Sequence, residues 1–284
     1  MPSVLYPPQR PQAIGEVLDS AFAIFKVTLL KCLPFGLLAM VTSQLKSIYD
    51  LATGRALGSR DLGSWLFFGL GVLASIVLWS AVILRQKAVL ERRASSGAAE
   101  LARAARALPS MAISLVLGLL GCAVGLVLLV LPGLYLMLAF PFVWQVILFE
   151  HRSPVEAFGA SRRLMYGNAW RVLTIFCVGL SMLLVFDIIV YMLVAVLLQF
   201  AGAGDVTLVT SAAPVVVIAL GAITSPFLCA LGLAAYGDLQ VRYTMRTAAA
   251  QGSAAATTAD AVQAKPSMGP EPASDRTVPG ERVG

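Results

Sequence analysis

RVLTIFCVGLSMLLVFDIIVYMLVAVL, residues Arg171 to Leu197, is an apolar run that contains one acidic side chain, Asp187. A helix of about twenty apolar residues is long enough to cross the ~30 Å hydrocarbon core of a bilayer. Five further stretches have this character: Lys31–Tyr49, Trp65–Leu84, Met111–Leu131, Leu134–Phe149 and Ala213–Tyr236. The sequence therefore predicts an all-α, polytopic membrane protein with six transmembrane helices.

The composition of the chain also indicates a lipid environment. Of the 284 residues, 58% are hydrophobic and 13% are charged, and the mean hydropathy is +0.84. A soluble domain has about 45–50% apolar and about 25% charged residues. The first twelve residues lack the pattern of a secretory signal, so we expect the first transmembrane helix itself to direct insertion.

Basic residues flank the expected spans unevenly. The second and fourth connections are rich in them, whereas the third and fifth connections have none. The basic residues of the second and fourth connections are Arg85, Lys87, Arg92, Arg93, Arg103, Arg106, Arg152, Arg162 and Arg163. The positive-inside rule places these connections and both termini in the cytoplasm. This topology explains the net charge of +6, so we do not expect a nucleic-acid partner.

Three cytoplasmic segments have the pattern of short amphipathic helices lying at the membrane interface. They cover residues 11–26, 96–109 and 153–168, and each precedes a pair of spans that we expect to form a hairpin. Aligning Glu16, Glu100 and Glu156 indicates an internal repeat of three units, although surface helices share such patterns by chance. LPG at residues 131–133 predicts a tight turn between the third and fourth spans.

Three parts of the chain resemble a bacterial membrane-domain family that is fused ahead of some glycerophosphoryl diester phosphodiesterases. They are RPQAIGEVLDSAFAIFK, LPGLYLMLAFPFVWQVILFEHRSPVEAFGASRRLMYGNAWRVL and AAYGDLQVRYTMR, within residues 10–246. The resemblance implies a fold and a compartment, the bacterial inner membrane, because most stand-alone members have no assigned activity. The family's partner phosphodiesterase needs catalytic histidines and a carboxylate cluster, whereas this chain has one histidine, His151. We therefore expect a protein without that catalytic domain, and not an enzyme.

The chain is expected to have three regions. Residues 1–12 form a flexible segment, residues 13–246 form the transmembrane domain with its interfacial helices, and residues 247–284 form a disordered cytoplasmic tail. The tail is rich in Ala, Thr, Ser, Pro and Gly, which leaves too little apolar surface for a packed core. The four cysteines lie inside apolar runs, so we expect no metal or redox site and no cofactor.

The resemblance points to a candidate charge cluster at the cytoplasmic face of the membrane. Its members are Glu150, Glu156, Arg162, Arg163, Asp238 and Arg242. The favoured interpretation is a structural clamp, or an anchor to anionic phospholipid headgroups, to which each basic residue adds about 1 kcal/mol. The alternative is a ligand site.

Asp187 defines a second candidate site, in the outer third of the membrane. At 1.5 Å per residue it lies about 24 Å from Arg171, still inside the hydrocarbon. A charged side chain there should face protein or water. Thr42, Gln44 and Lys46, together with Ser43, lie at the same depth in the first span and predict a polar pocket. In the alternative, Lys46 pairs with Asp50 and Asp187 is protonated or bonded to a hydroxyl.

Three functions fit these features. The first is a scaffold or accessory protein of the envelope, in contact with the lipid bilayer and with membrane-protein partners. The second is a transporter or permease that uses the pocket at Asp187. The third is a lipid-handling protein that uses the basic interfacial helices, with Arg162 and Arg163.

Overall fold

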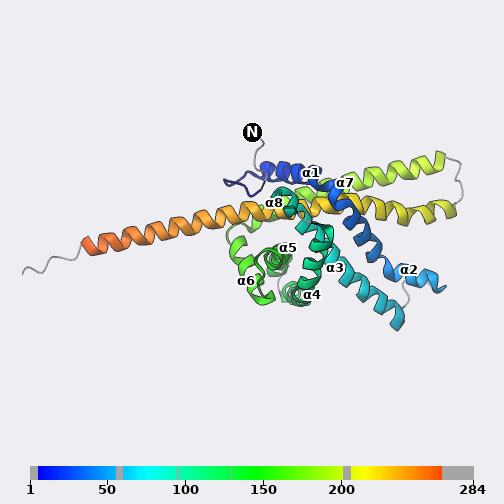
Figure 1. Ribbon diagram of the computed structural model, residues 1–284, viewed down its shortest axis with the longest axis horizontal. Coiled ribbons are helices and arrows are strands. Elements are labelled where there is room, and N and C mark those ends of the chain that lie inside the picture. The colour runs from blue at the N-terminus through cyan, green and yellow to red at the C-terminus, as the bar shows by residue number, and fades with distance from the viewer. Residues whose placement is uncertain (1–5, 56–59, 95, 129, 201–205, 264–284) are drawn as a thin grey trace, which may run out of the picture. The chain divides into compact units, whose positions relative to one another are not determined.

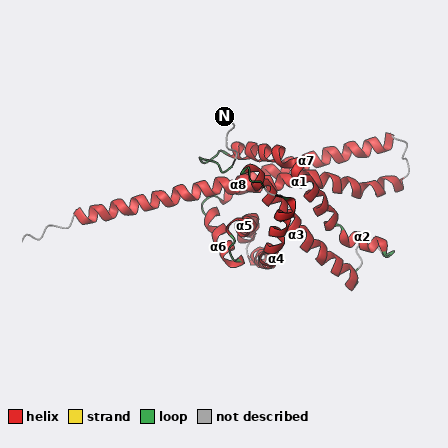
Figure 2. Ribbon diagram, in the orientation of Figure 1, coloured by secondary structure: helices red, strands yellow, loops and turns green. Residues whose placement is uncertain are grey.

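The computed structural model describes residues 6–55, 60–94, 96–128, 130–200 and 206–263. Within these ranges the chain is helical, with loops and no strand (Figure 2). The helices are α1 (Ile14–Ser43), α2 (Leu45–Ala52), α3 (Leu62–Leu90), α4 (Gly97–Leu128), α5 (Val130–Glu150), α6 (Pro154–Met165), α7 (Ala169–Phe200) and α8 (Val206–Gln263) (Figure 1). The chain divides into one compact unit of residues 1–243 and a second unit of residues 244–284.

Six helices among the described residues are long and apolar enough to cross a membrane. These are Ile14–Ser43, Leu62–Leu90, Gly97–Val127, Gly133–Glu150, Ala169–Leu197 and Val215–Ser253. Each overlaps one of the six spans predicted from the sequence. The all-α class and the multi-pass membrane protein are therefore confirmed.

Two of the three expected interfacial helices are not separate elements. Residues 14–26 and 97–109 are the first turns of α1 and α4, which continue into the membrane-crossing segments with Pro34 and Pro109 inside them. A proline bends a helix without necessarily ending it, because neighbouring groups can satisfy the freed carbonyl. The third, α6, is a separate helix that starts with a capping box formed by Ser153 and Glu156.

The first span ends earlier than the sequence predicted. Helix α1 stops at Ser43, and Gln44 separates it from the short helix α2, so Lys31–Tyr49 is not one continuous span. The hydroxyls of Thr42 and Ser43 donate to the carbonyls of Ala39, at 3.0 Å, and Met40, at 2.6 Å. Such local bonds compete with the helical ladder and favour a break at this point.

The expected LPG turn is also placed differently. Helix α4 ends at Leu128 and α5 begins at Val130, so residues 131–133 lie in the first turn of α5. A proline is tolerated there because the N–H groups of a first turn have no intrahelical partner. A Cβ on Gly133 would lie 2.7 Å from the Leu126 nitrogen, so only glycine allows α5 to approach α4 this closely.

The core of the first unit is built by close helix contacts. Helix α1 packs against α3, α3 against α4, and α4 against α5, which also contacts α6. At Gly36 a Cβ would lie 2.8 Å from the Ala222 carbonyl oxygen of α8. This oxygen has no hydrogen-bond donor within the helix, because the residue four positions later is Pro226, which has no N–H. Gln86 of α3 donates to the Pro226 carbonyl at 2.7 Å. A glycine and a buried amide thus fix α1 and α3 on α8.

The three segments of the proposed repeat share a burial pattern. The fourth and eighth residues of each helix are buried: Val17 and Ala21 in α1, Glu100 and Ala104 in α4, and Ala157 and Ser161 in α6. Glu100 therefore corresponds to Val17 and Ala157, so the alignment with Glu16 and Glu156 is shifted by one residue. Burial at positions four residues apart is common to amphipathic helices, so the internal repeat stays a prediction.

The expected disordered tail is helical in its first part. Helix α8 continues to Gln263, whereas residues 264–284 lie outside the described residues. Alanine, which is frequent in residues 247–263, has the highest helix propensity of all residues. A segment without an apolar core can still form a helix when its residues, here alanines, favour the helical backbone.

Candidate functional site

Asp238 of α8 lies at the centre of the most connected charge cluster. The residue is 1% exposed, and its carboxylate accepts hydrogen bonds from Arg171 at 3.1 Å and Arg242 at 2.9 Å. It also accepts from the backbone N–H of Gln12 at 2.8 Å. Both arginines donate to the carbonyl of Gln12 as well. One buried carboxylate therefore joins α7, α8 and the segment that precedes α1.

The segment before α1 is held against α8 beyond this cluster. A Cβ on Gly237 would lie 2.9 Å from both Pro8 and Tyr6, and Tyr6 is 7% exposed. Burial, with a smaller contribution from Glu91, raises the pKa of the Tyr6 phenol, which therefore remains protonated. We expected residues 1–12 to be flexible. Residues 6–12 instead pack against α8, and residues 1–5 lie outside the described residues.

Glu150, at the end of α5, belongs to a second group. Its carboxylate accepts from the Tyr236 hydroxyl at 2.8 Å and pairs with Arg152 at 2.7 Å. Gln240 donates to the same Tyr236 oxygen at 2.9 Å. This network connects the end of α5 to α8 two residues before Asp238.

The other members of the predicted charge cluster do not join these two groups. Glu156 forms the capping box of α6, where it accepts from the Ser153 N–H at 3.2 Å. Arg162 and Arg163 are exposed on α6 and pair with no acidic side chain in the described part of the chain. The single cluster that we predicted is therefore replaced by an Asp238 group, a Glu150 group and a helix cap.

The polar pocket predicted around Asp187 is also not formed as expected. Asp187 lies in a groove of about 410 Å³, whose described lining comes from α1, α7 and α8 and includes Met40, Tyr191 and Gly221. Thr42, Gln44 and Lys46 are not in this lining. One carboxylate oxygen of Asp187 is buried and has no hydrogen-bond partner in the described structure.

Lys46 takes the alternative partner. Its ammonium lies 2.8 Å from Asp50, which is 1% exposed and also accepts from the Ser64 hydroxyl of α3. The hydroxyl of Thr42 lies 3.4 Å from that of Ser75, again on α3. The polar C-terminal end of α1, with α2, therefore faces α3, whose Ser64 and Ser75 hydroxyls contact Asp50 and Thr42.

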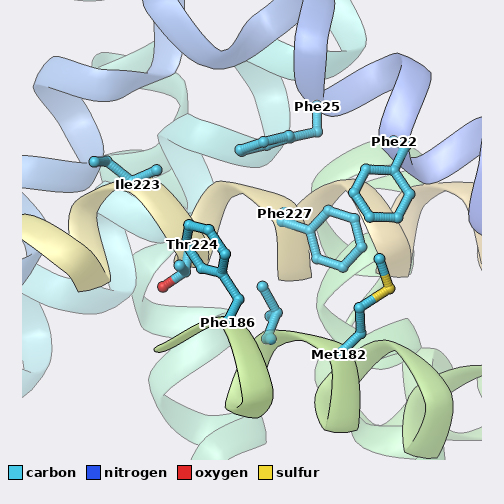
Figure 3. Close-up of a pocket in the computed structure, with 8 residues that line it drawn as sticks. Phe22, Phe25, Met182, Phe186, Ile223, Thr224 and Phe227 are labelled. Atoms are coloured by element: carbon cyan, nitrogen blue, oxygen red, sulfur yellow. The ribbon is translucent and has the colours of Figure 1, made fainter. Parts of the chain in front are cut away.

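An apolar cavity of about 160 Å³ lies next to the Asp187 groove, between α1, α7 and α8. Figure 3 shows Phe22 and Phe25 reaching into it from α1, Met182 and Phe186 from α7, and Phe227 from α8. The Phe22 and Phe227 ring centroids are 4.7 Å apart. Its walls expose carbon and sulfur, so this cavity suits an apolar group.

The described part of the chain contains no cluster of potential metal ligands. No three His, Cys, Asp or Glu side chains there lie close enough to hold a metal ion. Cys32, Cys122, Cys177 and Cys229 are free thiols.

Sequence reasoning missed two members of the Asp238 group and one buried acid. Arg171 was treated as the edge of a span, Gln12 as part of a flexible segment, and Asp50 only as an alternative partner of Lys46. An arginine at the start of an apolar run is a signal that Arg171 needs an acceptor, but its partner depends on which helix packs beside it. The role of Gln12 depends on its backbone, which carries no sequence signal.

Comparison of the chain with protein-family profiles, curated protein sequences and solved structures finds no match. The resemblance to the membrane domain of glycerophosphoryl diester phosphodiesterases therefore stays a prediction.

Proposed function

We propose that the chain is an accessory or scaffolding protein of the bacterial cytoplasmic membrane, which docks a transmembrane helix of another protein against α7. The observation that carries the proposal is the position of Asp187 on the most exposed span. In this proposal both termini are cytoplasmic, the spans form hairpin pairs and the chain is not an enzyme. The arginine-rich connections and the family resemblance support this compartment and topology.

Helix α7 is the span least covered by the rest of the chain. No residue in its most apolar 18-residue window is buried. Leu184, Val185, Phe186, Ile188 and Ile189 are each about half exposed, between 47% and 61%. Six consecutive helical positions turn through more than a full circle at 3.6 residues per turn. Exposed apolar side chains therefore point in most directions around the helix, where lipid or a partner would contact them, whereas Phe186, Asp187 and Ile188 also line the spaces shared with α1 and α8.

Lipid suits the apolar side chains of α7 but not Asp187. Ionisable residues within spans almost always face protein or a water-filled cavity, because a charged group costs ~2.5–3.5 kcal/mol at the centre of the membrane. One oxygen of the Asp187 carboxyl group is buried without a donor in the described structure, and the side chain also lines the open groove. A partner helix with a hydroxyl, amide or cationic side chain at this depth would supply a donor to the carboxyl group from the groove. Interhelical hydrogen bonds of this kind contribute about 0.6 kcal/mol on average.

The partner that we propose has a different sequence from this chain. In a symmetric pair of copies an interface presents the same patch from both sides. If Asp187 lay at the two-fold axis, a second Asp187 carboxylate would face the first and bring another acceptor in place of a donor. A heterologous helix that carries a donor meets the chemical requirement of the groove directly, and this is the partner that we propose.

Site-specific photo-crosslinking in native membranes tests this proposal. A photoreactive residue in place of Ile188, which lines the groove, should capture one partner protein, and Asp187→Leu should reduce the capture by about threefold or more. Asp187→Asn retains an acceptor and should preserve it. The control position is Leu119 of α4, which is 62% exposed outside the groove and should not capture this partner. Capture from Ile188 that is independent of residue 187, or a product with twice the mass of this chain, would contradict the proposal.

A transporter is the second candidate, because Asp187 opens onto a groove of about 410 Å³ and is not packed within the core. In that case Asp187→Asn should abolish a solute or proton flux while the folded protein remains in the membrane. In the docking proposal the same variant retains its partner and changes no flux through this chain.

A further inference from the structure

A basic hollow of about 370 Å³ lies between the first part of α4 and the end of α5. Its polar rim consists of Arg103, Arg106 and Ser110 of α4 with His151 and Arg152. Ile147 and Leu148 of α5 are buried and form its apolar floor. The hollow is separate from the Asp187 groove, the apolar cavity and the Asp238 group.

The charges on the rim are not balanced by the chain itself. Arg103 and Arg106 are exposed and form no ion pair with any described acidic residue. Arg152 pairs with Glu150, which also accepts from Tyr236. Of the three arginines, only Arg152 therefore has a carboxylate partner among the described residues, and this carboxylate is already engaged on α8. Like charges gathered around one hollow repel each other, so a bound anion would stabilise the arrangement.

The chain bends sharply to place this rim. His151 has a φ of 53°, in the left-handed region in which histidine is enriched together with asparagine and aspartate. A left-handed residue commonly follows the end of a helix. This turn ends α5 after Glu150 and places His151 and Arg152 in the wall of the hollow.

The depth of the hollow matches a lipid headgroup. The membrane-crossing segment of α5 ends at Glu150, immediately before His151 and Arg152. The arginines of α4 precede Pro109, which lies where the expected interfacial part of α4 meets its span. A phospholipid at this level would direct its phosphate to the arginines while its chains contact the apolar floor. Guanidinium groups bind phosphate oxygens in a bidentate manner, which an ammonium group cannot do.

We propose that Arg103, Arg106 and Arg152 form a binding site for a phosphate group, supplied by an anionic phospholipid of the same leaflet. The positive-inside rule explains why these residues are basic, but it does not require them to surround a hollow. Arg162 and Arg163 have the same sign and lie on α6, outside this hollow. They therefore provide a matched comparison with equal loss of charge. The site is independent of the docking role proposed for α7.

Calorimetric titration of the full chain in neutral detergent tests this site with three probes: short-chain phosphatidylglycerol, short-chain phosphatidylcholine and inorganic phosphate. We expect phosphatidylglycerol to bind most tightly. Arg103→Gln with Arg106→Gln should weaken it by about tenfold or more, which corresponds to one or two lost charge-assisted contacts. Arg162→Gln with Arg163→Gln should change it by less than about twofold, because these two arginines lie outside the hollow.

Each outcome decides a part of the proposal. Equal weakening by the two double variants, or no weakening by either, would show that the hollow is not a specific site. Inorganic phosphate that binds as tightly as phosphatidylglycerol would retain the phosphate site but assign its ligand to the aqueous phase. If the Gln variant does not fold, Arg103→Lys with Arg106→Lys keeps the charge and loses the bidentate geometry. It should still weaken binding several-fold, and unchanged binding would contradict the proposal.

Discussion

Two aspartates on neighbouring long helices have opposite surroundings. Asp238 on α8 accepts from Arg171, Arg242 and the backbone of Gln12, and it is 1% exposed. Asp187 on α7 has a buried oxygen without a partner and lies in an open groove. The first carboxylate connects elements of its own chain, and the second is left without a donor. The comparison separates a side chain that stabilises the fold from one that is available for another molecule.

The difference follows from where donors are available. Near Asp238 the chain brings arginines from α7 and α8 and the backbone before α1, so the cost of burying a charge is offset by several bonds. Near Asp187 the groove is lined mainly by apolar side chains such as Met40, Ile188 and Leu220, and the Tyr191 hydroxyl in the same lining does not bond the buried oxygen. A buried polar group without a partner costs about 1–3 kcal/mol. The fold tolerates this cost at Asp187, where we propose the docking site.

The largest effect should come from the Asp238→Ala variant. Removal of this carboxylate leaves Arg171 and Arg242, which are 19% and 25% exposed, without their main acceptor. Breaking a buried ion pair by removal of one partner typically costs about 3–5 kcal/mol. We expect the free energy of unfolding in detergent to fall by about this amount and residues 6–12 to become accessible to protease.

The matched control is Asp19→Ala on α1, because Asp19 is exposed and forms no ion pair with a described residue. Its effect should stay within about 0.5 kcal/mol, as for most surface substitutions. An Asp238→Ala protein as stable as the Asp19→Ala protein would remove the basis of the comparison.

The Asp187→Leu variant should change stability in the opposite direction. Leucine has a similar branched shape, removes the unpaired oxygen and adds apolar surface in the groove. We expect the isolated chain to gain about 1–3 kcal/mol, the cost of an unsatisfied buried group. Thermal unfolding in detergent measures this gain. Destabilisation would show that Asp187 already has a donor within this chain and would weaken the docking proposal.

Hydropathy alone was enough to predict much of the fold. The six spans could be located because a bilayer requires long apolar helices, and runs such as residues 65–84 and 171–197 leave no alternative. The boundaries were less accurate where a local bond or a helix continuation decided them. Thr42 and Ser43 break the first span, whereas Pro109 does not break α4.

The candidate sites depended on contacts that are distant in the sequence. The pair Asp238 and Arg242 could be predicted because two residues four positions apart on a helix lie next to each other on the same face. The role of Arg171 could not, because it requires knowing which helix packs beside α8. For the same reason Lys46 was assigned to Asp187, although the hydroxyl groups of α3 attract the polar end of α1 and the following helix α2.

The smallest effect should come from Arg10→Ala, which also removes an ion pair between an arginine and a carboxylate, but one that is exposed to water. Arg10 pairs with Glu16 at 2.7 Å, but the two side chains are 76% and 41% exposed. Such exposed pairs contribute about 0.2–1 kcal/mol, and Glu16 would retain its bond from the Ala13 N–H at 2.8 Å. We expect a loss in the free energy of unfolding within this range that disappears at high salt, since screening acts on exposed charges. A loss comparable to that of Asp238→Ala would mean that anchoring of the segment before α1, and not burial of the carboxylate, sets the cost of both substitutions.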